Sequence, residues 1–288
     1  ATTPLPGFNP HGLQGIALKL GDDAEAYVVP ERGLDVLEVR VAGKSAMWAN
    51  PAGHLRRPIG DLAHIEGFFT AGLENTGPPV MGLPLHGTYT WRPAADVRQT
   101  ESSSGQSAVE GTISAVDMVR GPYLTVHRRV RAVGARRAFL VKDVITADVE
   151  SEFMLLYHPN FPIAEGTRLE IAAETVMARD AISDNEMESY DVFRRVGQGR
   201  AVLPPTESGE AALAENFERC YAIKAVRDAD GGTTAMLTAA DNGSAIYVRY
   251  GAEGFDASQR VLYYWKNPRG AVAGLELGNC PLGRDYAR

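Results

Sequence analysis

Residues 124–131 read Leu-Thr-Val-His-Arg-Arg-Val-Arg, and their alternation of apolar and polar side chains decides the fold class. Leu124, Val126 and Val130 fall on one side of an extended chain, and the polar residues between them fall mostly on the other. Such period-two alternation is typical of a β-strand that buries one face. The stretch therefore predicts a half-buried strand.

Similar strand-like segments recur along the whole chain. They lie at residues 15–19, 24–29, 36–41, 139–146, 153–157, 220–226, 234–238, 245–250, 260–265 and 272–277. Turn signals such as Gly231-Gly232 and Asn267-Pro268-Arg269-Gly270 separate them, which predicts antiparallel hairpins. Only residues 207–219 have a helical composition, so the strand-helix alternation of parallel α/β proteins is missing. We expect an all-β fold, a large antiparallel β-sandwich, as a single domain over residues 1–288.

Two long segments show neither strand nor simple turn patterns. Residues 50–90 are rich in Gly, Pro, His and aromatic residues, and residues 174–205 are polar with scattered apolar positions. Loops of that length in a folded domain commonly carry function. Both segments are therefore predicted to be loops.

Composition excludes several classes of partner. Lys and Arg number 29 against 36 Asp and Glu, a net charge of −7 that gives no reason to bind nucleic acid. Apolar runs fall far short of the roughly 20 residues of a membrane helix, and no secretory leader is visible, so we expect a cytoplasmic protein with no membrane partner. The two cysteines, Cys220 and Cys280, are too few for a disulfide framework.

His158 and Asn160 follow the apolar run 153–157, which predicts an imidazole and an amide at a strand end, where a site can open. The alternative is that the ring of His158 caps the strand by bonding a backbone carbonyl.

Glu276 lies between glycines in the stretch 274–278, Gly-Leu-Glu-Leu-Gly. Alternation places Leu275 and Leu277 on one sheet face and Glu276 on the other, beside Gly274 and Gly278. Glycines leave the sheet surface around the carboxylate bare, so that a ligand such as a sugar ring could occupy the space. The alternative is a solvent-exposed strand glutamate.

Common catalytic motifs are missing. The sequence has no nucleophile elbow, phosphate-binding loop or dinucleotide fingerprint, and its histidines show no zinc-ligand spacing. We therefore expect neither a metal nor a cofactor. A carboxylate pair for glycoside hydrolysis stays open, because the separation of such groups is not visible in the sequence.

Taken in order, several segments resemble the galactose mutarotase-like superfamily, and within it the aldose-1-epimerase-related DUF4432 branch. The segments are Pro30-Glu31-Arg32-Gly33-Leu34-Asp35, Ala71-Gly72-Leu73-Glu74-Asn75-Thr76-Gly77-Pro78-Pro79, Leu85-His86-Gly87, Leu156-Tyr157-His158-Pro159-Asn160, Trp265-Lys266 and Gly274-Leu275-Glu276-Leu277-Gly278-Asn279. The resemblance implies a supersandwich with a sugar-binding cleft on one concave sheet.

The resemblance also implies roles for particular residues. Glu276 matches the catalytic base, His158 the acid and His86 the sugar-binding histidine. Further positions fall in the branch's own motifs and are expected to line the cleft: Arg32, Asn75, Lys266 and, as a weaker candidate, Asn160. Arg32 and Lys266 could hold hydroxyls or a substrate carboxylate, or could equally be structural ion-pair partners.

The implied reaction is anomer exchange. Glu276 takes the proton of the anomeric hydroxyl while His158 protonates the ring oxygen, and reversal after rotation gives the other anomer. We expect the glutamate to keep its ordinary pKa. Two alternatives stay open: a keto/aldo sugar isomerase or epimerase using the same pair, and a non-catalytic carbohydrate-binding protein. A homo-oligomer is left open.

Overall fold

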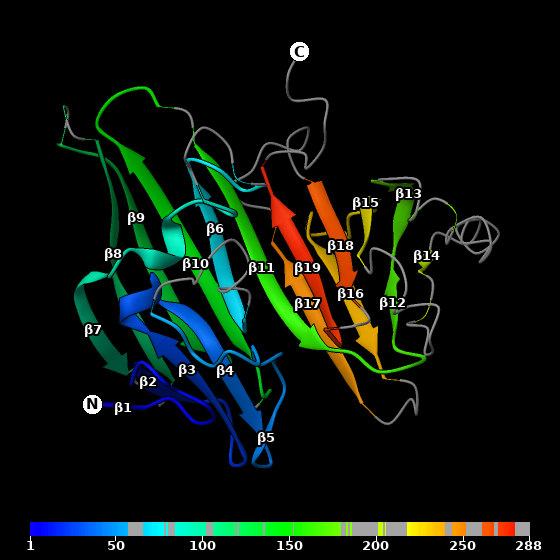
Figure 1. Cartoon of the computed structure of the whole chain (residues 1–288), viewed down its shortest axis with the longest axis horizontal. Coiled ribbons are helices and arrows are strands. Elements are labelled where there is room, and N and C mark those ends of the chain that lie inside the picture. The colour runs from blue at the N-terminus through cyan, green and yellow to red at the C-terminus, as the bar shows by residue number, and fades with distance from the viewer. Residues whose placement is uncertain are drawn as a thin grey trace. The chain divides into compact units, whose positions relative to one another are not determined.

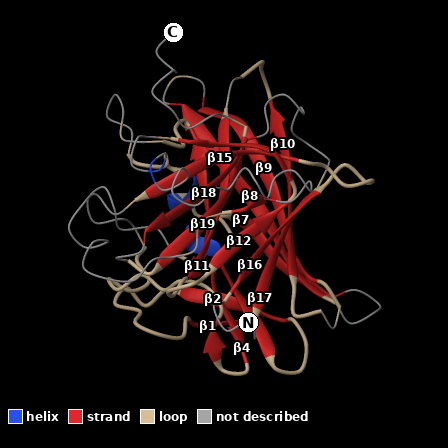
Figure 2. Ribbon diagram, turned by 90° about the vertical axis from the view of Figure 1, so that its right-hand side faces the viewer, coloured by secondary structure: helices blue, strands red, loops and turns tan. Residues whose placement is uncertain are grey.

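A computed structural model of the chain describes residues 1–56, 66–77, 79, 84–101, 106–117, 119, 121–134, 136–151, 153–179, 183, 185, 201–203, 205, 218–239, 244–251, 261–267 and 270–279. It divides into two compact units, Ala1–Asn160 and Phe161–Arg288. Strands fill the described part, and the helical elements in it are short turns (Figure 2). The expectation of one domain over residues 1–288 stays a prediction.

The first unit contains two antiparallel sheets (Figure 1). The strands of one are Thr2–Pro4 (β1), Gln14–Lys19 (β2), Ala24–Val29 (β3), Asp35–Val41 (β4), Lys44–Ser45 (β5), Phe68–Leu73 (β6) and Met154–Pro162 (β11), which runs across the unit boundary. Their order is β1-β2-β3-β4-β6-β11, with β5 paired to β4. Two short 3₁₀ turns, Pro30–Arg32 (η1) and Tyr89–Trp91 (η3), belong to the same unit.

The second sheet of this unit is formed by Ala95–Glu101 (β7), Ser107–Asp117 (β8), Gly121–Ala132 (β9) and Phe139–Ala147 (β10). Its order is β10-β9-β8-β7. Leu124, Val126 and Val130 of β9 are buried, as the alternation predicts. Arg128 occupies the same buried side, because it is two residues from both Val126 and Val130.

Arg128 joins the two sheets of the first unit through ion pairs. Its Nη1 donates to Asp35 Oδ1 of β4 at 2.7 Å, and its Nε and Nη2 donate to the two carboxylate oxygens of Asp143 of β10 at 2.9 and 2.7 Å. The Tyr157 hydroxyl of β11 donates to the same Asp143 at 2.9 Å. The Arg128 and Asp35 side chains are fully buried, so this network is part of the core.

The second unit also has two antiparallel groups of strands. Ala173–Ala178 (β13), Arg219–Ala225 (β15), Val261–Asn267 (β18) and Val272–Gly278 (β19) follow the order β19-β18-β15-β13. Arg168–Ile171 (β12), Ala201–Val202 (β14), Thr233–Thr238 (β16) and Ala245–Tyr250 (β17) follow the order β14-β12-β16-β17. The buried Tyr250 hydroxyl of β17 donates to the Leu275 carbonyl of β19 at 2.6 Å and connects the two groups.

The all-β antiparallel prediction is confirmed, because the paired strands within each unit are antiparallel. The prediction of loops is wrong for three strands: β6 lies inside the segment 50–90, β14 lies inside the segment 174–205, and β13 enters the latter from residue 173. All six residues of β6 are buried, so no alternation marks this strand in the sequence. The expected helix 207–219 lies mostly outside the described residues, and Arg219 begins β15.

Candidate active site

His158 lies within β11 and not at its end, since the strand continues to Pro162. The register pairs it with Phe69 of β6, and the two rings stack with centroids 4.6 Å apart. The His86 ring meets His158 edge-on at 5.4 Å and Phe69 at 5.5 Å. The first unit therefore brings both sequence-predicted histidines together, on an aromatic residue that the sequence analysis did not single out.

His86 is held by a tight turn after β6. Its backbone has a left-handed φ of 63°, and Gly87 follows with a φ of 71°. A Cβ on Gly87 would come within 2.4 Å of the Asn75 and Gly72 carbonyl oxygens, so only glycine fits there. The Asn75 amide donates to the Gly77 and Pro84 carbonyls at 3.1 and 3.0 Å. Asn75 therefore stabilises the turn that carries the imidazole.

The His86 ring has a defined protonation state. Its Nδ1 lies 2.7 Å from the Thr76 carbonyl oxygen, which can only accept, so Nδ1 carries the hydrogen and Nε2 is an acceptor. Burial lowers the pKa of His86 to about 4, although the bond to Thr76 opposes this. At neutral pH the ring is uncharged.

Asn160 supports the strand that carries His158. Its side-chain amide donates to the His158 carbonyl at 3.0 Å and to the Gly67 carbonyl at 3.2 Å, and the residue is fully buried. Its Oδ1 has no hydrogen-bond partner in the part of the chain that the structure describes. An acceptor atom is therefore placed two residues from His158, on the same side of β11.

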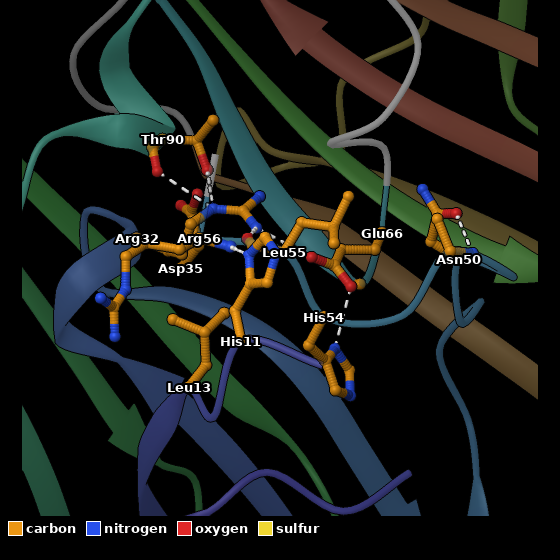
Figure 3. Close-up of polar contacts among 12 residues, drawn as sticks. His11, Leu13, Arg32, Asp35, Asn50, His54, Leu55, Arg56, Glu66 and Thr90 are labelled. Atoms are coloured by element: carbon orange, nitrogen blue, oxygen red, sulfur yellow. Dashed lines mark hydrogen bonds and ion pairs between the residues drawn. The ribbon is translucent and has the colours of Figure 1, made fainter. Parts of the chain in front are cut away.

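Arg32 is fully buried in an ionic cluster of the first unit (Figure 3). Its Nη1 donates to Glu66 Oε1 at 2.8 Å and to the Leu55 carbonyl at 2.6 Å, and its Nε donates to Thr90. His54 Nδ1 lies 2.9 Å from the other Glu66 oxygen. These contacts favour the ion-pair alternative for Arg32 over a sugar-binding role.

Glu276 occupies β19 in the second unit and is buried, so the alternative of a solvent-exposed glutamate is wrong. The register pairs Glu276 with Tyr263 of β18, and Gly274 with Trp265. Paired residues share a sheet face, and so do residues two apart along a strand. The face that carries the carboxyl therefore also carries two glycines and two aromatic side chains.

Lys266 lies on the opposite face of this sheet. It is paired with Ala273 and is an odd number of positions from Tyr263, so its side chain points away from the face of Glu276. Its Nζ donates to the Pro205 carbonyl at 3.1 Å, and the residue is fully buried. The register thus corrects the expectation that Lys266 lines the same surface as the carboxyl.

The expectation of an ordinary glutamate pKa is also corrected. Burial raises the pKa of Glu276 to about 8, against the charge of Arg179, which lowers it; Glu218 adds to the increase. A carboxylate with a raised pKa is a stronger proton acceptor once it is ionised. The cost is that only about a tenth of the molecules are ionised at pH 7.

This pKa predicts how stability changes with pH. Between pH 4.5 and about 8, the folded carboxyl keeps a proton that the unfolded one has released, so the free energy of unfolding falls as pH rises through that window. Glu276→Gln removes the dependence. In urea unfolding the variant should match the parent near pH 4.5 and exceed it by up to a few kcal/mol at pH 8, at about 1.4 kcal/mol for each pKa unit.

The matched control is Glu174→Gln, which changes an exposed glutamate of β13 in the same sheet. It should leave the pH dependence of the parent in place. Parallel stability curves for Glu276→Gln and the parent from pH 5 to 9 would contradict the raised pKa.

Among the described residues, no helix is long and apolar enough to cross a membrane. No group of three or more His, Cys, Asp or Glu side chains among those same residues is arranged to hold a metal ion.

Solved structures with the same fold identify its class. A candidate aldose 1-epimerase from Klebsiella pneumoniae subsp. pneumoniae MGH 78578 superposes with a TM-score of 0.75 at 20% identity, covering 98% of this chain and 75% of that one. The Slr1438 protein from Synechocystis sp. PCC 6803 has a TM-score of 0.62 at 17% identity, covering 97% and 90%. A galactose mutarotase-like protein from Lactobacillus casei ATCC 334 has a TM-score of 0.51 at 13% identity, covering 95% and 92%. The chain therefore has the galactose mutarotase-like fold.

The family follows from the sequence profile of the domain of unknown function DUF4432, which matches residues 10–288. The chain belongs to the DUF4432 family, and the resemblance noted in the sequence is confirmed. No curated protein matches it at a significant level.

Proposed function

We propose that the protein is an aldose 1-epimerase, which exchanges the anomers of a sugar. The observation that carries the proposal is the buried carboxyl of Glu276, with its raised pKa, on a sheet face that also holds Gly274, Gly278, Tyr263 and Trp265. Aromatic rings present apolar surface for the C–H faces of a sugar. The glycines have no side chain, so nothing projects from the sheet beside the carboxyl. The structural neighbours that are described as epimerases or mutarotase-like support the same class of reaction.

In this proposal Glu276 is the base. Its carboxylate takes the proton of the anomeric hydroxyl as the C1 to ring-oxygen bond breaks, which leaves an aldehyde at C1. His158 in its protonated form gives a proton to the ring oxygen, which becomes the C5 hydroxyl. Rotation about the C1–C2 bond and reversal of both transfers close the ring to the other anomer, and both residues return to their starting states.

His86 binds and does not transfer a proton. With hydrogen on Nδ1 and a pKa of about 4, its Nε2 is an acceptor that fits a sugar hydroxyl donor. Its edge-on contact with His158, and the stacking of His158 on Phe69, fix the direction of both rings. Fixed rings reduce the entropy that a proton transfer would otherwise cost.

The test follows the anomers directly. Freshly dissolved single anomers of an aldose panel, including uronic acids and sugar phosphates, are followed by proton NMR in heavy water with and without the protein. We expect faster approach to anomeric equilibrium while every carbon-bound proton is retained, because mutarotation exchanges only O–H protons. Incorporation of deuterium at carbon would establish the isomerase alternative instead.

Binding without acceleration would establish the carbohydrate-binding alternative. Sugar binding is measured by thermal shift or calorimetry on the same panel. His158→Gln keeps the ring position polar but removes the acid, and we expect it to bind sugar and lose the acceleration. If His158→Gln accelerates as well as the parent, the assignment of the acid is wrong.

A further inference from the structure

Arg179 lies on the same sheet face as Glu276. It follows β13, and its backbone N–H donates to the Cys220 carbonyl of β15 at 2.9 Å. The register pairs Cys220 with Trp265 of β18, and Trp265 with Gly274 of β19. The row from Arg179 to Gly274 therefore crosses four strands, and Gly274 shares its face with Glu276, two residues along β19.

The spacing of this row fits a sugar. Neighbouring strands are about 4.8 Å apart, so the Cα atoms of Arg179 and Gly274 are separated by about 14 Å. Cys220 and Trp265 lie between them on the same face. A pyranose that stacks on the Trp265 ring with its anomeric carbon at Glu276 would therefore carry the substituent remote from C1 towards Arg179.

The charge of Arg179 acts on the Glu276 carboxyl. The guanidinium lowers the pKa of the Glu276 carboxyl against the effect of burial, so the two groups interact electrostatically. Its ion pair with Glu218 is long, at 3.4 Å, and both side chains are more than a third exposed. Such a pair contributes little, and a carboxylate or phosphate that binds the guanidinium in two places could replace it.

We propose that the site over Glu276 takes an anionic aldose, with Arg179 binding the acid group remote from the anomeric carbon. The inference rests on the proposed sugar function and adds a substrate class to it. Uronates, sugar sulfonates and sugar phosphates share the chemistry that Arg179 recognises. The test contains a separate arm for each.

The experiment compares kcat/KM for matched sugars: glucose with glucuronate, with 6-deoxy-6-sulfoglucose and with glucose 6-phosphate. We expect the parent to prefer at least one acid form over glucose by tenfold or more, and Arg179→Gln to lose that preference. Glu218→Gln removes the competing carboxylate and should raise kcat/KM for the same acid sugar. Opposite changes in the ratio of kcat/KM for the acid sugar to that for glucose separate recognition of the acid group from structural damage, and also from the effect of both residues on the pKa of Glu276, which is common to all sugars.

The control is Arg168→Gln in β12. Arg168 has the same exposed fraction as Arg179, 35%, and a similar ion pair with Glu170 at 3.3 Å, but it lies in the other group of strands. It should leave every sugar unaffected. Added salt should reduce the preference for the acid sugar in the parent.

Three results would overturn the inference. If the parent uses glucose as well as all three acid sugars, the acid group is not recognised, and the mutarotase proposal stands alone. If Arg179→Gln lowers kcat/KM equally for neutral and acid sugars, Arg179 acts on the Glu276 carboxyl or on the fold and does not bind the acid group. If no sugar is bound or turned over, both proposals are wrong.

Discussion

Glu276→Gln is expected to lower the rate of mutarotation by a factor of about 10²–10⁴, the range that a general base contributes. Gln has nearly the same shape and can still form hydrogen bonds to a hydroxyl, but it cannot accept the anomeric proton. Sugar binding should therefore survive while turnover is lost. The rate is measured with an excess of one anomer, after the uncatalysed rate at low buffer concentration is subtracted.

The stability of this variant makes the result unambiguous. The same substitution is expected to stabilise the protein at pH 8, because it removes a buried carboxyl that loses its proton there. An inactive protein that resists urea better than the parent cannot owe its inactivity to unfolding. A rate within threefold of the parent, or the same loss in the control Glu174→Gln, would show that Glu276 is not the base.

The active parent should also respond to pH in a defined direction. If Glu276 must be ionised, kcat/KM rises as pH increases towards about 8 and then levels off on that side of the profile. A carboxyl near its ordinary pKa would instead give a profile that is already flat above pH 6.

Arg128→Leu is the substitution with the largest expected effect on stability. It leaves the buried carboxyls of Asp35 and Asp143 without their shared cation, and removing one partner of a buried ion pair costs about 3–5 kcal/mol. Two hydrogen bonds of Asp35, from the Thr70 backbone and hydroxyl, survive the change. They should not be enough to offset the lost charge.

The loss should depend on pH in a way that identifies its cause. Burial raises the pKa of Asp35, and Arg128 is the main charge that opposes this. Without Arg128 the carboxyl can avoid its charge by taking a proton, so the deficit in free energy of unfolding should be smaller at pH 5 than at pH 8. Urea unfolding at both pH values provides the measurement.

Arg137→Leu is the control for this substitution. Arg137 also bonds an aspartate, Asp23, with two nitrogens, but the guanidinium is more than half exposed. Surface pairs are worth about 0–1 kcal/mol, so this variant should unfold close to the parent. Equal losses in Arg128→Leu and Arg137→Leu would contradict the view that burial makes the first network important.

The strands that the sequence predicts are those in which apolar and polar residues alternate. β3, β4, β9, β10 and β19 alternate in this way, and their bounds fall within a few residues of the expectation, although β19 is buried at every position. Strand β6 could not be predicted, because Phe68–Leu73 is buried on both faces and its apolar and polar residues do not alternate. β11 extends past the expected end because Pro159 pairs with Phe68 inside the sheet, where a proline usually argues against a strand.

The residues of the site also divide into those that could be placed from the sequence and those that could not. Glu276 could be placed on one face from its own segment, since alternation and the two glycines are local signals. Lys266 and Arg179 could not be assigned to a face, because that depends on the register between strands far apart in the chain. The burial of Arg32 and Arg128 was equally hidden, because their partners Glu66 and Asp143 are distant in sequence.

The strict alternation along β18 and β19 has a practical consequence for protein engineering. Tyr263, Trp265, Gly274 and Gly278 share one face, whereas the leucines beside Glu276 occupy the other. A combinatorial library limited to these four positions would vary the surface next to the carboxyl while the leucine layer that holds the strands stays constant. Tyr263 and Trp265 are themselves buried, so each member of the library would be selected for substrate range and for thermostability together.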